Sequence, residues 1–596
     1  MRHGIILHIF LLITFVWSGC APININKVKN TLYSSFKTIS PENEKFQSVV
    51  LRDDITFDVS VTEKGLLVHK RVHRIYRIKR DRKFKVVLNL ENGEALSHIA
   101  ARTINRDVKD NLLTHNAAEG PDRVIDLKMK DIFIRKYRDN TSEKNEASKK
   151  ITFSYPGIKE NSMVEYIYES ERLITRRPYM LYKSIATREN RPVVSYHRSI
   201  SLPSGIIDGT GKWSFDHTVI KPDIIKKDSD TEKGKVRYTW SAMDLEPRYS
   251  EPHAPDIAET NPGIRFVIGK WNSPQTMSEE LYNSIYKYHR ITPLIKETAA
   301  KITAGKSSDS EKIAALVHFV QSMLPGRYRE YKHTIAAYNP TSVLKRQYGN
   351  EKDSVSLLIS LLHASGFTDA KPVLAAKRGQ PDLPLHLKLN SLSNLIRLQH
   401  EDVEYWIQPW SRKRTFDDIS PIFFSMPALI LSPDGDGEEA IIPEPEKYRH
   451  GRDYELSLEI SPDFNSDMKS TVTWHGDNVS VNRYELANAS QQEKHAFAAN
   501  LLKHRYYNSS ITDSPGISDI SHSDTDSIED TFSFSFTAKP PLLIKRPWSE
   551  TYDLDIMPLD IGYSKGSDTL FEKTRSDPIT WETPYASHIR LTITYP

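Results

Sequence analysis

The chain has 596 residues, a length that predicts three or four domains. Hydrophobic residues make up 38% of the sequence and charged residues 27%, which is enough apolar material for several cores and excludes a wholly disordered chain. The net charge of +4 argues against a dedicated nucleic-acid binder. The single cysteine, Cys20, excludes an internal disulfide framework, a cysteine-rich zinc site and a cysteine-ligated iron–sulfur cluster.

The first segment has the features of an export signal. A short positive start, Met1-Arg2-His3, precedes a mostly apolar run over residues 5–17, and the small residues Ser18 and Gly19 stand directly before Cys20. The apolar run is too short to span a bilayer comfortably, so we expect cleavage rather than a permanent transmembrane helix.

Ser18-Gly19-Cys20 resembles the lipobox of bacterial lipoproteins, although Trp17 stands where an aliphatic residue is usual; a plain secretory signal is the alternative. The resemblance implies a signal peptide over residues 1–19, a diacylglyceryl group on the Cys20 sulfur and a polar tether over 20–45. Because Ala21 rather than an aspartate follows, it also implies an anchor in the outer membrane, facing the periplasm.

Residues 46–270 are predicted to form a β-rich domain. Alternating apolar residues from Ile55 to Val61 are typical of a half-buried strand, and Glu63-Lys64-Gly65 predicts a turn into a second strand that begins at Leu66. Segments 139–150 and 222–236 are polar, and we expect solvated loops there.

The second of these strands is strongly basic. One interpretation is a patch that binds anionic lipid headgroups, lipopolysaccharide or an acidic glycan. The other is the exposed face of a β-hairpin, whose charges keep a sheet edge from pairing. The residues of this candidate patch are Lys70, Arg71, Arg74, Arg77, Lys79 and Arg80.

The hydrophobic period becomes helical after about residue 275. A helix is predicted from Ser310, with an apolar stripe that runs from Ile313 to Val320, and a second over 354–364 that ends at Gly366. Strands are predicted near 372–374, 392–398 and 403–407, so residues 275–432 form an α/β domain. Residues 300–307 match a loose phosphate-loop pattern, but they follow a helix rather than a strand, so we predict a helix end and a turn.

Residues 433–452 are rich in proline and glycine and are predicted to be a linker. The last domain, 453–596, returns to alternating apolar residues, as at Phe532, Phe534 and Phe536, with one helix expected around 484–503 and a long loop over 508–530. No metal site and no cofactor are predicted, because the acidic segment 434–438 lacks the spacing of a calcium loop.

Several segments together resemble one bacterial family. Residues 68–77 and 151–166 are similar to the β-rich domain of unknown function that precedes many transglutaminase-like domains. The motifs of the transglutaminase-like fold itself have similar counterparts in this chain, at residues 311–320, 339–344, 349–353, 392–396 and 405–409. The resemblance implies a multidomain α+β protein with a β-rich N-terminal domain, a papain/transglutaminase-like α/β middle domain and a β-sandwich-like C-terminal domain.

The catalytic triad of that family is replaced here. The family has a cysteine at the start of the core helix, a histidine on the next long strand and an aspartate on the strand after. The resemblance puts Glu351, Asn394 and Gln408 at these positions. A carboxylate is a poor nucleophile toward an amide, and neither amide side chain shuttles a proton near neutral pH. Because no cysteine follows Cys20, no shift of the alignment restores a thiol nucleophile.

We therefore expect a non-enzymatic envelope lipoprotein that binds or scaffolds a peptide, a protein or a glycan, with no nucleic-acid partner. The alternative is a hydrolase or lyase in which Glu351 acts as general acid or base, with Asp353 as its partner. A purely structural envelope protein is a third class. An open cleft with a second carboxylate or a histidine beside Glu351 would favour the enzyme.

Overall fold

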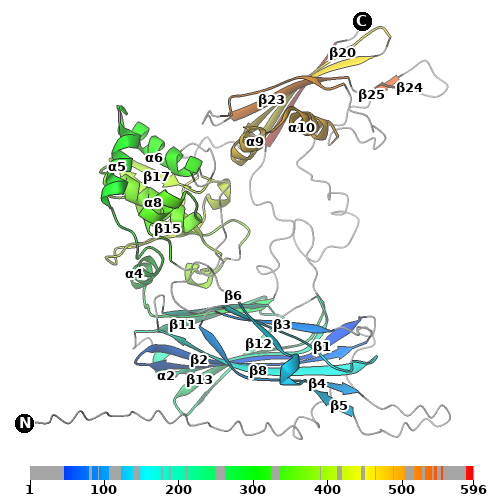
Figure 1. The fold of residues 1–596 in the computed structure, drawn as a ribbon, viewed down its shortest axis with the longest axis vertical. Helices are drawn as coiled ribbons and strands as arrows, with labels where there is room; N and C mark the ends of the chain where they lie inside the picture. Colours follow the sequence, from blue (N-terminus) through cyan, green and yellow to red (C-terminus); the bar gives the residue numbers. More distant parts are fainter. Residues whose placement is uncertain are drawn as a thin grey trace, which may run out of the picture.

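The computed structural model describes residues 46–79, 84–91, 93–105, 123–137, 148–175, 179–186, 190–207, 212–247, 262–323, 336–380, 382–389, 391–411, 416, 419–444, 450–463, 465–487, 489–503, 516–525, 531–539, 543–545, 552–554 and 586–594. The protein is a multidomain α+β chain with several sheets (Figure 1). Three bodies follow one another along the chain: a β-rich first body, a helical middle body around a sheet, and a C-terminal body. No helix in the described part of the chain is long and apolar enough to cross a membrane.

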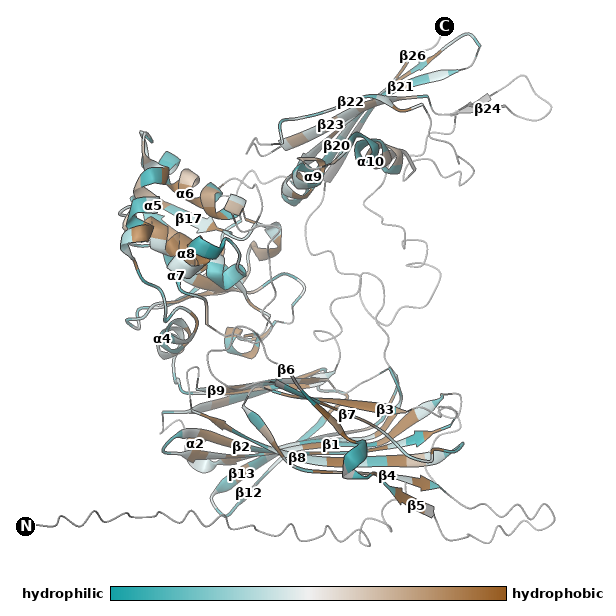
Figure 2. Cartoon of the chain, viewed as in Figure 1, coloured by the Kyte–Doolittle hydropathy of each residue, from teal (hydrophilic) through white to brown (hydrophobic). Residues whose placement is uncertain are grey.

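One eight-stranded sheet forms the base of the first body. Apolar and polar residues alternate along its strands (Figure 2), as expected for a sheet with one face in a core. β1 and β10 pair in parallel, whereas the other described neighbours in this sheet are antiparallel. In spatial order the strands are β12 (Lys226–Glu232), β13 (Lys235–Leu245), β10 (Val193–Pro203), β1 (Ser48–Thr62), β2 (Gly65–Ile78), β8 (Ser162–Ile174), β4 (Glu94–Asn105) and β5 (Arg123–Asp126).

Two three-stranded sheets cover one face of this base (Figure 1). Phe57 and Tyr166 of the base make ring contacts with Phe266 of one small sheet and Phe153 of the other, so all three sheets share one core. The small sheets are β11 (Ser214–Ile220), β14 (Gly263–Gly269) and β9 (Met180–Ala186), and β3 (Lys85–Leu90), β7 (Ser148–Ser154) and β6 (Phe133–Tyr137). The short helices η2 (Met129–Asp131) and α2 (Ser204–Ile207) lie in the connections.

Strand β14 lies between two cores, and all of its residues are buried. Ile264, Phe266 and Ile268 belong to the core of the first body, whereas Val267 belongs to the core of the middle body. Successive side chains of a strand point to opposite faces, so β14 packs on both sides, with Arg265 buried on the face of Val267. The first and middle bodies are therefore packed against each other through this small sheet.

The middle body has a five-stranded sheet with helices on one face. In spatial order the strands are β17 (Val403–Ile407), β16 (Ser393–His400), β15 (Lys371–Ala375), β18 (Pro427–Ile430) and β19 (Glu439–Ile441). The helices are α4 (Pro274–Ile285), α5 (Pro293–Thr303), α6 (Asp309–Met323), α7 (Pro340–Arg346) and α8 (Glu351–Ala364), with the short η3 (Leu385–Leu387) and η4 (Pro421–Phe423). The helices predicted from Ser310 and over 354–364 and the three predicted strands are confirmed, and 300–303 are helical as expected.

The C-terminal body has one five-stranded sheet covered by two helices. Val479, Leu486, Phe497 and Ala498 of the helices pack on the apolar face of the sheet. The described residues therefore have a helical second layer where a second packed sheet was predicted. The strands, in spatial order, are β22 (Ser518–His522), β23 (Thr531–Ala538), β21 (Ser466–His475), β20 (Gly451–Ile460) and β26 (Ala586–Thr594), the helices are α9 (Asp477–Ala487) and α10 (Gln491–Lys503), and β24 (Leu543–Lys545) pairs with β25 (Tyr552–Leu554).

Four further predictions differ from the structure. Within the predicted loop 222–236, residues 226–232 form the edge strand β12, which is fully exposed and held by main-chain pairing with β13. Within the predicted linker 433–452, residues 439–441 form β19 and extend the middle sheet. The single helix expected over 484–503 is two helices, and residues 518–522 of the loop 508–530 form β22.

Candidate functional site

The middle sheet separates two sets of side chains. Ile396, Leu398 and Ile407 face the helices, whereas Leu395 and Trp406 face a smaller core that contains residues of η4. This alternation determines which residues of β16 and β17 can approach the start of α8.

The start of α8 is fixed by a reciprocal cap. Asn350 accepts a hydrogen bond from the backbone N–H of Asp353, and the Asp353 carboxylate accepts one from the backbone N–H of Asn350, each at 3.1 Å. A side chain at Gly349 would put its Cβ 2.7 Å from the Cβ of Asp353, so glycine is required there by close approach. The motif 349–353 is thus explained by the geometry of a helix start.

The carboxylate of Asp353 is buried in this cap. Its side chain has no exposed surface, and its carboxylate also accepts from the backbone N–H of Tyr338 at 2.7 Å and pairs with Arg346 at 3.1 Å. Burial raises the pKa of Asp353, and the hydrogen bonds and the Arg346 charge oppose that rise. Asp353 therefore does not face Glu351 as a second catalytic carboxylate.

Glu351 and Asn394 are brought together. Glu351 is the first residue of α8, and its Oε2 lies 3.4 Å from the backbone N and 3.5 Å from the side-chain Nδ2 of Asn394 on β16. Within the described residues, Asn394 supplies all the hydrogen bonds recorded for the Glu351 carboxylate. The start of α8 and strand β16 thus bring Glu351 and Asn394 side by side.

Two aromatic residues that the sequence interpretation did not include complete the surroundings of Asn394. The Tyr286 hydroxyl donates to Asn394 Oδ1 at 3.0 Å, and the Trp410 indole N–H donates to the Asn394 carbonyl at 2.7 Å. Burial, together with the charge of Glu351, raises the pKa of Tyr286 well above its ordinary value, so its phenol stays protonated. No sequence motif marks Tyr286, because it follows α4, far from 394 along the chain.

Gln408 lies elsewhere. Strand alternation places Gln408 on the face of Trp406, opposite to that of Asn394, and its Oε1 accepts a hydrogen bond from the backbone N–H of Ser420 at 2.9 Å. The pairing of Ile396 with Ile407, continued by two residues, puts Pro409 opposite Asn394. A proline has no polar side-chain group, so the position opposite Asn394 offers none to orient the Asn394 side chain.

The arrangement offers little acid–base chemistry. Glu351 is a half-buried carboxylate beside amides, a protonated phenol and the charge of Lys352, and Asn394 can neither take up nor release a proton near neutral pH. Burial lowers the pKa of Lys352, and the charges of Asp353 and Glu351 oppose that fall. In the part of the chain that the structure describes, no group of three or more His, Cys, Asp or Glu side chains is placed to hold a metal ion.

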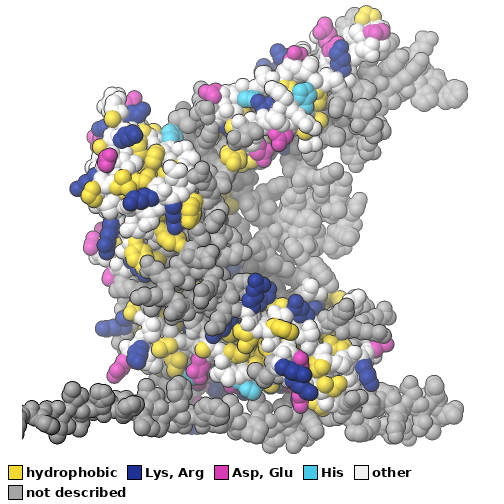
Figure 3. Space-filling model, viewed as in Figure 1, with side chains coloured by type: hydrophobic (Ala, Val, Ile, Leu, Met, Phe, Trp, Pro, Cys, Tyr) yellow, Lys and Arg dark blue, Asp and Glu magenta, His cyan; other side chains and the backbone are white. Residues whose placement is uncertain are grey.

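The predicted basic patch does not form one surface. Side chains along β2 alternate, so Lys70 and Arg74 point into the first body, where they pair with Glu94 and Asp53, whereas Arg71 lies on the opposite face near Glu169. Arg77 donates to Asn161, Lys79 follows the strand, and Arg80 lies outside the described residues. On the face shown in Figure 3, basic and acidic side chains are interspersed. Because β2 lies between β1 and β8, the strand is not a sheet edge either.

The lipid-anchor prediction concerns residues that the structure does not describe. Cys20, the signal peptide and the tether all lie within residues 1–45, outside the described part of the chain. The anchor remains a prediction from the sequence.

No family model matches the chain, and no curated protein matches it. Among solved structures, it is similar to a protein from Parabacteroides distasonis ATCC 8503 described as a "putative protease", with 11% identity, a TM-score of 0.49, and coverage of 83% of this chain and 93% of that one. It is also similar to the M1 zinc metallopeptidase of Deinococcus radiodurans (9% identity, TM-score 0.20, 37% of this chain and 42% of that one). A "putative nutrient binding protein" of Legionella pneumophila matches with 8% identity, a TM-score of 0.20, and coverage of 53% of this chain and 94% of that one. These likenesses assign neither a family nor a function to this chain.

Proposed function

We propose that this chain is a lipid-anchored protein of the cell envelope that binds or scaffolds an envelope protein, peptide or glycan, and that its middle body is a transglutaminase-like domain without catalytic activity. One observation carries the proposal. Glu351 begins the central helix, and its hydrogen bonds within the described residues go to Asn394, the residue that the resemblance aligns with the catalytic histidine of the family.

The runner-up is a hydrolase or lyase that uses Glu351. Such an enzyme needs a second group that exchanges protons with substrate or water. Asp353 is buried in the helix cap, Asn394 is neutral, and the raised pKa of Tyr286 keeps its proton in place. The described surroundings of Glu351 therefore favour the non-catalytic role.

The catalytic arm of the proposal is tested on the full-length protein in detergent. We expect neither glutamine–amine crosslinking nor peptide hydrolysis above the buffer rate. Glu351→Gln removes the charge at this position, and Glu439→Gln, an exposed carboxylate on β19, is the matched control. Turnover that is lost in Glu351→Gln and kept in Glu439→Gln would establish the enzyme and overturn the proposal.

The anchoring arm is tested separately. Mass spectrometry of the mature N-terminus should show an acylated Cys20 preceded by no other residue, and the protein should fractionate with the outer membrane. Cys20→Ser should abolish acylation and membrane retention. An unacylated mature N-terminus in the wild type would support the plain secretory signal instead. A photoreactive residue at position 351, used in cells, would then identify the partner.

A further inference from the structure

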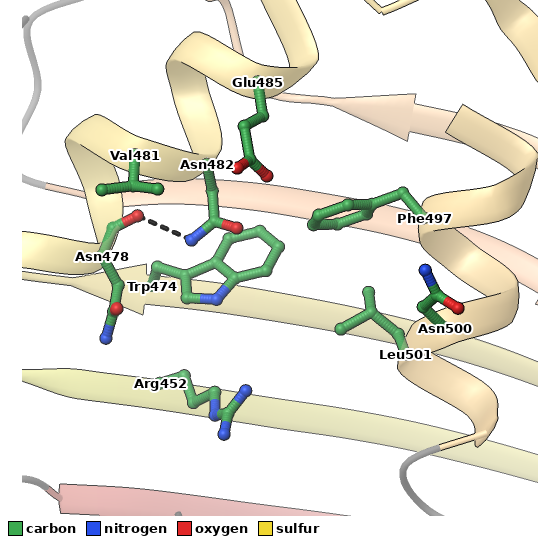
Figure 4. A pocket seen from close by; sticks show the side chains of 9 residues that line it. All are labelled: Arg452, Trp474, Asn478, Val481, Asn482, Glu485, Phe497, Asn500 and Leu501. Carbon is green, nitrogen blue, oxygen red and sulfur yellow. Dashed lines mark hydrogen bonds between the residues drawn. The ribbon is translucent and has the colours of Figure 1, made fainter. Parts of the chain in front are cut away.

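The C-terminal body contains a pocket of about 450 Å³, far along the chain from Glu351 and Asn394. It lies between α9 and α10, above strands β20 and β21 (Figure 4). Its volume falls within the range of small-molecule sites.

The wall from α9 has helical spacing. Asn478, Val481, Asn482 and Glu485 recur at intervals of three and four residues, so they share one face of the helix. The buried residues Val479, Arg483 and Leu486 form a different stripe, which packs against the sheet. The helix therefore presents one stripe to the core and a separate stripe of mostly polar residues to the pocket.

The floor is apolar: Trp474, a core residue that is only 3% exposed, closes it from below, and the partly buried Phe497 and Leu501 face the pocket. Trp474 and Arg452 form a cross-strand pair on β21 and β20, and Phe497 of α10 meets the Trp474 ring edge-on at 6.0 Å. Leu501 adds an apolar side chain from the next turn of α10. In Figure 4, the side chains of Asn482 and Glu485 extend over the Trp474 ring.

Several polar groups of the wall have no partner in the described protein. Within the described residues, the side chains of Asn478, Glu485 and Asn500 take part in no hydrogen bond or ion pair, and Asn482 uses its Nδ2 to donate to the backbone O of Asn478 at 2.7 Å. Amides that both donate and accept, beside the apolar side chains of Phe497 and Leu501, match a ligand with hydroxyl groups on its edge and C–H groups on its face.

Other ligand classes fit less well. An anionic ligand would meet one cation, Arg452, and be repelled by Glu485. A peptide strand has no sheet edge to join here, because β20 and β21 each have a strand on both sides. A lipid chain would leave the amides of the wall without partners.

We propose that this pocket binds a neutral saccharide, with the apolar face of a sugar ring against Phe497 and Leu501 and its hydroxyl groups on Asn482, Glu485 and Asn500. The site is independent of the proposed role of the middle body, since it shares no residue with that region. A sugar bound there would give the C-terminal body a recognition function of its own.

The test is calorimetric titration of the full-length protein in detergent with chitobiose and maltose, alongside a neutral hexapeptide. We expect at least one disaccharide to bind and the hexapeptide not to. Asn482→Ala and Glu485→Gln should each weaken sugar binding roughly tenfold, as the loss of a hydrogen bond to a ligand predicts. Gln492→Ala, on an exposed position of α10 outside the pocket, should leave binding unchanged.

These variants lie at the wall rather than in the core, so circular dichroism should show an unchanged fold. The proposal is overturned if neither sugar binds at about 10 mM. It is equally overturned if the hexapeptide binds in their place, or if binding is the same in the wall variants and in Gln492→Ala. Because this readout does not involve Glu351, failure here leaves the proposed function of the middle body standing.

Discussion

A carboxylate at the first residue of a buried helix behaves differently from the thiolate that the family resemblance implies at the same place. Both are favoured by the N–H groups and dipole of the helix start. The thiolate becomes a nucleophile, whereas the carboxylate of Glu351 becomes a hydrogen-bond acceptor for Asn394. At the residue scale, the Glu351 carboxylate therefore ties the start of α8 to β16 through Asn394.

The buried cluster around Asp53 carries a second prediction for a single residue. Its carboxylate pairs with Arg198 and with Arg74, each at 2.7 Å, and Arg198 is only 2% exposed. Asp53→Asn would leave Arg198 buried without its countercharge, so we expect a loss of roughly 3 to 5 kcal/mol in urea unfolding. The exposed pair between Asp58 and Lys235 is the control, and Asp58→Asn should change stability by less than about 1 kcal/mol.

The same cluster predicts a dependence on pH. Burial alone would raise the pKa of Asp53, but Arg198 and Arg74 hold it below its ordinary value. A lowered pKa in the folded state means that the stabilisation is present above about pH 4, where the unfolded carboxyl is ionised, and is lost as the pH falls through the folded value. The difference between wild type and Asp53→Asn should therefore shrink in acid. A difference that stays constant down to about pH 2 would contradict this assignment.

Gly349 tests the close approach at the helix start. A methyl group there would lie 2.7 Å from the Cβ and 3.0 Å from an oxygen of Asp353, so Gly349→Ala must displace the cap and should cost roughly 1 to 3 kcal/mol. Gly205→Ala is the control, since nothing lies within 4 Å of a Cβ at that position. Equal unfolding midpoints for the two variants would show that the cap adjusts without cost.

At the scale of elements, the start of α8 can be probed with a thiol. In a Cys20→Ser background, we expect the thiol of Glu351→Cys to react with iodoacetamide at neutral pH about ten times faster than that of Thr368→Cys, because a helix N-terminus lowers a thiol pKa by a unit or more. Thr368 is exposed beyond the opposite end of the same helix. The accessibility of each thiol is measured with a neutral spin label. If the two reaction rates are equal once they are corrected for accessibility, the start of α8 does not activate a thiol.

Sequence patterns predicted the elements of the middle body well, because α6 and α8 carry regular apolar stripes and β15 and β16 are short, mostly buried runs. Strand β12 was missed, since its charged side chains are exposed and its stability comes from pairing with β13. The break between α9 and α10 did have a signal: Ser490 and Glu493 form a capping pair.

The candidate site could be predicted only in part. A helix start against a strand brings together Glu351 and Asn394, two residues that only the family resemblance had singled out. The position of Gln408 follows from the alternation of side chains along β17, which puts Gln408 on the same face as Trp406. Tyr286 could not be predicted, because its contact with Asn394 arises from the packing of α4 and joins segments that are distant in sequence.

At the scale of the whole molecule, the first and middle bodies are joined through strand β14, and the C-terminal body has a core of its own. Val267 of β14 belongs to the core of the middle body while its neighbours Phe266 and Ile268 belong to the first. Polar contacts reinforce this interface: His386 lies 2.6 Å from Asp216, and the Tyr182 hydroxyl donates to the Leu387 carbonyl. The Ser420 hydroxyl of the middle body also donates to the Asp477 carboxylate at the start of α9, at 2.5 Å. The described members of the C-terminal core, in contrast, all lie between Tyr454 and Ala538.

This division predicts two separate unfolding transitions. A core shared through one strand couples the first and middle bodies, so calorimetry should show them melting in one transition and the C-terminal body in another. Phe534→Ala, at a fully buried position, should destabilise only the C-terminal transition, by about 3 to 5 kcal/mol. Val267→Ala should destabilise only the joint transition, by roughly 2 kcal/mol. If Phe534→Ala lowered the midpoints of both transitions equally, the C-terminal body would unfold together with the other two bodies, and the prediction would be wrong.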